Sequence, residues 1–163
     1  MGKGLILIKR ALISVSDKTG VDRLARKLNK WKIEIVSTGG TAKFLKNSGV
    51  PVTDVSDITD FPELMDGRLK TLHPKIHGGL LAIRENDSHI SAMKNHSIPQ
   101  IDLLIVNLYP FEKVIKTNTS SSEIVENIDI GGPAMIRAGA KNSNYVTVIV
   151  DQQDYNKCLI ELE

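Results

Sequence analysis

Short aliphatic runs alternate along the chain with segments in which apolar residues recur every three or four positions. The runs at 11–15, 33–37 and 101–107 predict buried strands. The last run is nearly continuous in aliphatic residues, as expected for a strand of a parallel sheet that is covered on both faces. Residues 20–30 predict a helix, because apolar positions follow the i, i+3, i+4, i+7 pattern and basic residues fill the other face. This alternation indicates an α/β fold with a mostly parallel sheet.

Weaker patterns complete the predicted order of elements. Further strands are expected at 52–55, 80–83 and 145–150, and further helices at 41–48, 87–95, 120–126, 133–141 and 151–162. Residues 56–79 are less regular, contain several prolines and glycines, and predict one turn of helix at 61–65. Because long loops in compact domains are often functional, this segment is a candidate for part of a site.

Length and charge narrow the class of protein. The 163 residues fit one globular domain, and 41% apolar with 25% charged residues is typical of a folded, water-soluble chain. Lysine and arginine number 21 against 19 aspartates and glutamates, and this net charge of +2 offers no electrostatic case for binding nucleic acid or a membrane surface. Any basic site must therefore be local.

Cys158 is the single cysteine of the sequence, so neither an internal disulfide nor a multi-thiolate metal site is possible. This use of cysteine fits a reducing cytosol, and we expect a cytoplasmic protein. Cys158 shares a predicted helix face with Tyr155 and Leu159, which favours a core residue over a nucleophile. No apolar run approaches the roughly 20 residues that span a bilayer, and the run at 5–8 is too short for a secretory signal.

Two predicted strand-to-helix turns are rich in hydroxyls, glycine and backbone N–H groups. The first, SVSDKTG, spans 14–20, and the second, STGGT, spans 37–41. A helix N-terminus favours an anion, and parallel strands present such turns side by side at the carboxyl edge of a sheet. The pair therefore predicts a phosphate-binding cradle. Each turn alone is equally well explained by Ser/Thr capping with a glycine turn, and neither has the spacing of a Walker loop or a dinucleotide fingerprint.

The segment GRLKTLHP at 67–74 adds positive charge. Pro74 biases His73 toward an extended conformation, and in an extended segment Arg68 and Lys70 project to the same side. The alternative is a solvated basic loop. His73 and His77 are four residues apart, but a metal site is disfavoured, because Pro74 argues against a regular helix and no second cluster of ligands follows.

Two further segments place polar groups near predicted strand and helix ends. NLYPF at 107–111 puts an amide and a phenol after a strand, although this segment alone favours Tyr109 and Phe111 covering the core. IDIGGP at 128–133 puts Asp129 beside two glycines at a helix start, where it could simply act as an N-terminal cap. Lys141, near the end of that helix, could complement the helix dipole. Each of these residues alone is compatible with a structural role.

Taken together, these segments resemble one known family. SVSDKTG, STGGTAKFL, GRLKTLHP, HGG, NLYPF, IDIGGPAMIRAGAKN and the VTVI strand are similar, in this order, to the N-terminal IMP cyclohydrolase domain of the bifunctional purine-biosynthesis proteins that also carry an AICAR transformylase. The match runs from about Ala11 to Tyr155. The resemblance implies a methylglyoxal-synthase-like fold, a three-layer α/β sandwich with a mostly parallel sheet, in one domain over 1–163.

The resemblance also implies an activity. It is the ring closure of 5-formamido-imidazole-4-carboxamide ribotide to inosine monophosphate with loss of water, the last step of de novo purine biosynthesis. Asp129 would accept the carboxamide proton, with Lys141 beside it to orient or shuttle protons. Lys70 and Tyr109 would donate to the formyl oxygen as negative charge develops. Neither a cofactor nor a metal is expected, because no hydride or phosphoryl group moves.

Substrate binding is assigned by the same resemblance to the two turns, the basic segment and the strand ends. The residues are Ser14, Ser16, Asp17, Lys18, Ser37, Thr38, Gly39, Gly40, Thr41, Arg68, Leu69, Thr71, Val106, Asn107 and Ile130. The turns with Arg68 and Thr71 would hold the phosphate and ribose. Val106 and Asn107 would contact the base, and Ile130 would lie on the carboxamide side.

Members of that family normally continue for several hundred residues into the transformylase domain, whereas this sequence stops at Glu163 within a predicted helix. We therefore expect no transformylase activity. The family forms dimers, so the expected partners are a purine ribotide and a second copy of the chain, in a dimer weakened without that domain. Two alternatives share the fold: a non-catalytic effector-binding domain, as at the end of carbamoyl-phosphate synthetase, and methylglyoxal synthase. The GRLKTLHP, NLYPF and IDIGG segments argue against both.

Overall fold

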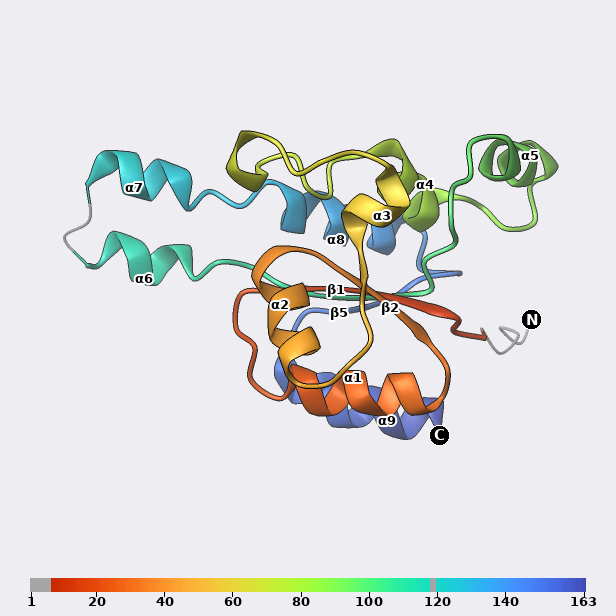
Figure 1. Cartoon of the computed structure of the whole chain (residues 1–163), viewed down its shortest axis with the longest axis horizontal. Helices are drawn as coiled ribbons and strands as arrows, with labels where there is room; N and C mark the ends of the chain where they lie inside the picture. Colours follow the sequence, from red (N-terminus) through yellow and green to blue (C-terminus); the bar gives the residue numbers. More distant parts are fainter. Residues whose placement is uncertain (1–6, 118–119) are drawn as a thin grey trace.

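The computed structural model describes residues 7–117 and 120–163, and within them five strands form one parallel sheet (Figure 1). The strands are β1 (Arg10–Val15), β2 (Glu34–Ser37), β3 (Thr53–Asp54), β4 (Leu103–Asn107) and β5 (Thr147–Ile149). Their order is β3-β2-β1-β4-β5, and every neighbouring pair is parallel. The strands therefore all end at one edge of the sheet, with β1 at the centre.

Helices cover both faces of the sheet (Figure 1). One face carries α1 (Val21–Lys30), α2 (Gly39–Asn47) and α9 (Tyr155–Leu162), and the other carries α3 (Val55–Thr59), α4 (Pro74–Leu81) and α8 (Gly131–Lys141). The alternation of side chains along β1 serves both layers: Ala11 and Ile13 belong to the first core, and Leu12 to the second. All three are fully buried. The predicted three-layer α/β sandwich is confirmed.

Three helices lie beyond these layers: α5 (Asp87–Asn95), α6 (Phe111–Ile115) and α7 (Ser121–Glu126). Figure 1 shows α6 and α7 side by side on an arm that leaves the sheet after β4 and returns to α8. Short 3₁₀ turns, η1 (Met65–Gly67) and η2 (Gln152–Asp154), complete the described elements. In the described part of the chain, every helix is too short or too polar to cross a membrane.

Helix α4 replaces the strand predicted at 80–83, so that prediction is wrong. Pro74 occupies the first helical position, where its missing N–H and fixed φ cost nothing, and it therefore starts a helix instead of preventing one. His73 is extended as predicted, with φ −137° and ψ 142°, and caps the helix by accepting the Lys75 N–H on Nδ1 at 3.1 Å. Leu80 is then buried on the α4 face, within the second core.

Two other short helices, α3 and α6, were not predicted from the sequence patterns. Helix α3 starts with a capping box, in which Asp54 and Asp57 each accept from the other's backbone N–H, yet it is too short to show a helical period. Helix α6 is equally short. The turn of helix predicted at 61–65 is wrong as well, since the helical turn lies at η1. Cys158 is buried in the first core, which confirms its interpretation as a core residue.

Candidate functional site

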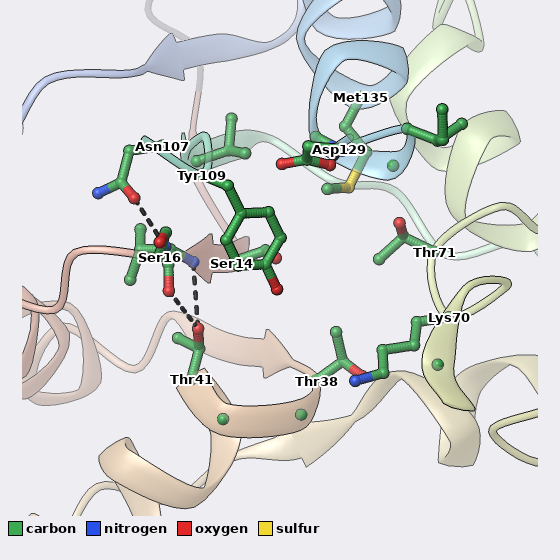
Figure 2. Close-up of a pocket in the computed structure, with 18 of the residues that line it drawn as sticks. Ser14, Ser16, Thr38, Thr41, Lys70, Thr71, Asn107, Tyr109, Asp129 and Met135 are labelled. Atoms are coloured by element: carbon green, nitrogen blue, oxygen red, sulfur yellow. Dashed lines mark hydrogen bonds between the residues drawn. The ribbon is translucent and has the colours of Figure 1, made fainter. Parts of the chain in front are cut away.

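A cavity of about 510 Å³ opens at the carboxyl edge of the sheet, where β1, β2 and β4 end. Its walls come from the turns after these strands, from the segment around η1 and from the start of α8 (Figure 2). Most residues assigned to the site from the sequence line it: Ser14, Ser16, Lys18, Thr38, Gly39, Gly40, Thr41, Arg68, Lys70, Thr71, Val106, Asn107, Tyr109, Asp129 and Ile130. The fold thus gathers segments that are far apart in the sequence.

The first turn of α2 forms one wall of the cavity and is flanked by two ammonium groups. A Cβ placed on Gly39 would lie 2.8 Å from Nζ of Lys70, and one placed on Gly40 would lie 3.9 Å from Nζ of Lys18. Within the described structure, Thr38 gives this helix no side-chain capping hydrogen bond, so the wall presents backbone N–H groups. A helix N-terminus beside two cations is a strong site for an anion. This geometry fits the predicted phosphate cradle.

Asn107 shapes the turn between β1 and α1. Its Oδ1 accepts the backbone N–H groups of Ser16 at 2.7 Å and Asp17 at 3.0 Å, and its Nδ2 donates to the Asp17 carbonyl at 2.9 Å. These three bonds join the end of β4 to the turn and hold Ser16 and Lys18 at the cavity wall. Asn107 lines the cavity as predicted, but its amide is used to build the turn, not held free for a base.

Two hydroxyls that the sequence assigned to binding form hydrogen bonds within the protein, from α2 to β1 and from β2 to β1. Thr41 is buried, and its Oγ1 donates to the Val15 carbonyl at 2.9 Å while accepting the Val15 N–H at 3.1 Å. Ser37 is fully buried and donates to the Ile13 carbonyl at 2.7 Å. The assignment of Ser37 to the binding site is wrong, because its side chain turns into the sheet.

The basic segment at 67–74 reaches the cavity wall through tight backbone turns around η1. Arg68 has helical φ and ψ of −64° and −24°, so the extended conformation predicted for it is wrong. Arg68 pairs through two nitrogens with the carboxylate of Glu126 on α7, and this guanidinium holds the pKa of Glu126 below its ordinary value. Lys70 pairs with Glu63. Both cations thus reach the cavity while held by carboxylates from neighbouring segments.

The start of α8 forms the opposite wall. Asp129 accepts the Gly132 N–H on Oδ1 at 2.8 Å, so it does cap the helix, and it also lines the cavity. A Cβ on Gly132 would lie 2.7 Å from Oδ2 of Asp129, and one on Gly131 would lie 2.6 Å from Oγ1 of Thr71. Glycine at both positions lets these polar groups approach the helix end. Figure 2 shows the phenol of Tyr109 directed into the space between the walls.

Three further predicted residues lie elsewhere. Lys141 is exposed at the last position of α8, and ten helical residues after Gly131 correspond to about 15 Å along the axis, so its predicted place beside Asp129 is wrong. Asp17 is exposed, and its Oδ1 accepts the backbone N–H and the hydroxyl of Thr19. Leu69 lines a neighbouring cavity. The periodic pattern of a helix does not tell which of its turns faces a site.

Several residues that line the cavity were not assigned from the sequence: Val15, Gly67, Val125, Glu126, Ile128, Gly131, Gly132 and Met135. The three glycines stood inside the motifs and could have been found from their need for close approach. Glu126 and Val125 come from the arm and carry no local pattern. The described residues contain no group of three or more His, Cys, Asp or Glu side chains placed to hold a metal ion.

Known proteins resemble both the sequence and the structure. The bifunctional purine biosynthesis protein PurH of Paracoccus denitrificans is 61% identical over 158 residues, and that of Thermoanaerobacter sp. is 58% identical over 158 residues. These matches cover 97% and 96% of this chain but 30% and 31% of the relatives, so the chain spans about a third of their length.

A solved structure described as the crystal structure of ForH superimposes with a TM-score of 0.80 at 34% identity, over 94% of this chain and 78% of that one. Residues 20–134 match the MGS-like domain family, and this segment holds α1 to the first turn of α8, including most of the cavity wall. The chain therefore belongs to the family of MGS-like domains.

Proposed function

We propose that this cavity closes the purine ring, converting 5-formamido-imidazole-4-carboxamide ribotide to inosine monophosphate with loss of water. The observation that carries the proposal is the pairing of two walls: an anion seat at α2, and a carboxylate with a phenol at the opposite side. The extensive identity to bifunctional purine biosynthesis proteins supports the same activity.

The ribotide phosphate would occupy the seat at α2. Its two negative charges match the helix N-terminus and the ammonium group of Lys18, and Thr38 adds a hydroxyl at the same wall. Arg68 is a further cation of the wall; it bonds to Glu126 through two nitrogens, and a guanidinium can bind two phosphate oxygens in the same way. Binding at this end fixes the remainder of the ribotide toward α8.

Ring closure joins the carboxamide nitrogen to the formyl carbon. The formyl oxygen becomes an oxyanion on attack and leaves as water, which carries one proton from the carboxamide nitrogen and one from the formamido nitrogen. Lys70 and the phenol of Tyr109 are the donors of the cavity that suit this oxygen. Their preorganisation stabilises the charge in the transition state instead of the ground state.

Asp129 is the carboxylate placed to take the carboxamide proton. Its Oδ1 is held by the Gly132 N–H, which fixes the carboxylate while leaving Oδ2 at the cavity wall. Because Lys141 lies outside the cavity, we assign proton acceptance to Asp129 without it. Positioning of both reacting groups in one pocket supplies a further part of the rate.

The test is to incubate the purified chain with the formylated ribotide and to follow inosine monophosphate by ultraviolet absorbance. We expect product well above the uncatalysed rate. Saturable binding of the ribotide without product would contradict the enzyme and support an effector-binding domain instead. Release of inorganic phosphate from a triose phosphate, with no ring closure, would point to a methylglyoxal synthase.

A further inference from the structure

Lys70 stands between two cavities. The second cavity, of about 480 Å³, adjoins the first and shares with it the walls formed by Thr38, Gly39 and Lys70. Glu63 lines the second cavity, is not part of the lining of the first, and forms an ion pair with the Lys70 ammonium. The carboxylate therefore holds the lysine from behind, on the side away from the proposed substrate.

The path of the Lys70 side chain is built into the backbone. Gly67 and Gly39 both have left-handed φ values, of +87° and +55°. A Cβ on Gly67 would collide with the Lys70 side chain and would lie 2.5 Å from Oε1 of Glu63, and a Cβ on Gly39 would lie 2.8 Å from the ammonium. The absence of a side chain at these two glycines thus leaves the space that the Lys70–Glu63 pair occupies.

Electrostatics explain why this lysine needs a partner there. Its ammonium lies at the N-terminus of α2, which is the positive end of the helix dipole, and Lys18 flanks the same turn. Both effects repel a cation. A lysine also has several rotatable bonds and would lose rotamer freedom by staying in place. A carboxylate beside the ammonium offsets the repulsion and favours this one conformation.

We propose that Glu63 is a positioning residue, which acts through Lys70. It holds the Lys70 ammonium at the boundary of the two cavities, where the ammonium can donate to the formyl oxygen of the substrate as negative charge develops there. Part of this inference rests on the proposed function, since the effect on turnover requires an enzyme. The placement of Lys70 by Glu63 does not, and it can be measured by itself.

The variant Glu63→Gln keeps the shape of the side chain and removes its charge. Lys70 should react at least about threefold faster with a small amine-acetylating reagent, measured peptide by peptide by mass spectrometry, because a lysine released from its ion pair is more accessible. Glu63→Asp should return the rate toward that of the unchanged protein. The matched control is Asp60→Asn, which breaks the neighbouring Lys75–Asp60 pair and suits the left-handed conformation at 60, with φ 54°.

On turnover, Glu63→Gln should lower kcat/KM by about 10- to 100-fold, the size expected when a catalytic group is displaced by about 1 Å. In a Lys70→Ala background the same substitution should cost less than about twofold, because its effect passes through the lysine. Asp60→Asn should change kcat/KM by less than about twofold in both backgrounds.

Equal acetylation of Lys70 in the unchanged protein and Glu63→Gln would overturn the placement. If Glu63→Gln lowered kcat/KM equally in the unchanged protein and in the Lys70→Ala background, the inference that Glu63 acts through Lys70 would be overturned. A chain that shows no turnover at all would contradict the proposed function, while the acetylation rates would still support or overturn the placement. Thermal unfolding of each variant shows that the fold is retained.

Discussion

The two edges of the sheet carry similar charged groups in opposite settings. At the amino edge, Asp102 is 2% exposed, and its Oδ2 accepts the N–H groups of Lys9 at 2.7 Å and Arg10 at 2.9 Å. Its other oxygen pairs with Arg84, whose guanidinium also donates to the Ile101 carbonyl at 2.8 Å. This carboxylate is fully engaged within the protein.

At the carboxyl edge, the charges remain at the surface of an open cavity. The side chains of Lys70 and Arg68 are 29% and 65% exposed, and those of their partners Glu63 and Glu126 are 47% and 56% exposed. Such exposed pairs contribute little to stability, and their charges stay at the surface of the cavity, where a ligand can reach them. The difference teaches that burial, and not the type of residue, separates charges that hold the fold from charges available to a ligand.

The largest expected effect is at the amino edge. Asp102→Ala should lower the free energy of unfolding by about 3–5 kcal/mol, because it leaves the Arg84 side chain, which is only 14% exposed, without its partner and two backbone N–H groups without an acceptor. Urea denaturation measures this change. The control Asp22→Ala, which removes the exposed pair with Arg26, should cost less than about 1 kcal/mol. Similar losses of unfolding free energy in both variants would contradict the stabilising role assigned to the buried charge at the amino edge.

At the carboxyl edge, Asp129→Asn should act on chemistry instead. The amide oxygen still accepts the Gly132 N–H, so the fold is kept, but the proposed proton acceptor is lost. We expect kcat to fall by about 10²- to 10³-fold with KM changed by less than about threefold. Asp151→Asn is the matched control, since Asp151 accepts the Gln153 N–H at 2.8 Å in the same way but outside the cavity. Near-full turnover in Asp129→Asn would remove this residue from the mechanism.

A smaller effect is expected at the anion seat. Lys18→Met should raise KM for the ribotide by about 10-fold and leave kcat within about threefold. The substitution removes one positive charge from the proposed phosphate site and none from the side chains at the reacting groups. Steady-state kinetics measure both parameters. Lys43→Met removes an exposed charge of α2 that lies outside the cavity, and it should change neither parameter. An unchanged KM in Lys18→Met would argue that the phosphate binds elsewhere.

The smallest expected effect concerns pH. Partial burial lowers the pKa of His77 from its ordinary value of 6.5, although the hydrogen bond with the Thr71 backbone opposes this shift. The unfolded chain therefore takes up this proton first, so the stability that neutral His77 contributes is present above pH 6.5 and is lost as the pH falls through the lower folded pKa. Urea denaturation at pH 7.5, 6.5 and 5.5 should show this decline. His77→Gln should flatten it, and the exposed control His96→Gln should not.

The sequence allowed the fold class to be predicted from local patterns, and most residues that line the cavity from those patterns together with the family resemblance. The aliphatic run that became β4 and the hydroxyl-rich turns are visible without any tertiary context. Ser37 and Thr41 show where such patterns stop: whether a hydroxyl at the end of β2 or the start of α2 bonds a backbone group or a ligand depends on how its segment packs against β1. Glu63 and Glu126 could not be assigned, since their partners are defined only by the packing of the η1 segment and the arm.

The most direct test of the account is a crystal structure of this chain with inosine monophosphate. The phosphate should lie at the first turn of α2, within hydrogen-bonding distance of the Gly39 and Gly40 N–H groups and of Nζ of Lys18, with the base beside Asp129. A phosphate bound away from α2, or a base directed away from the start of α8, would contradict the assignment of this edge of the sheet as the site of ring closure.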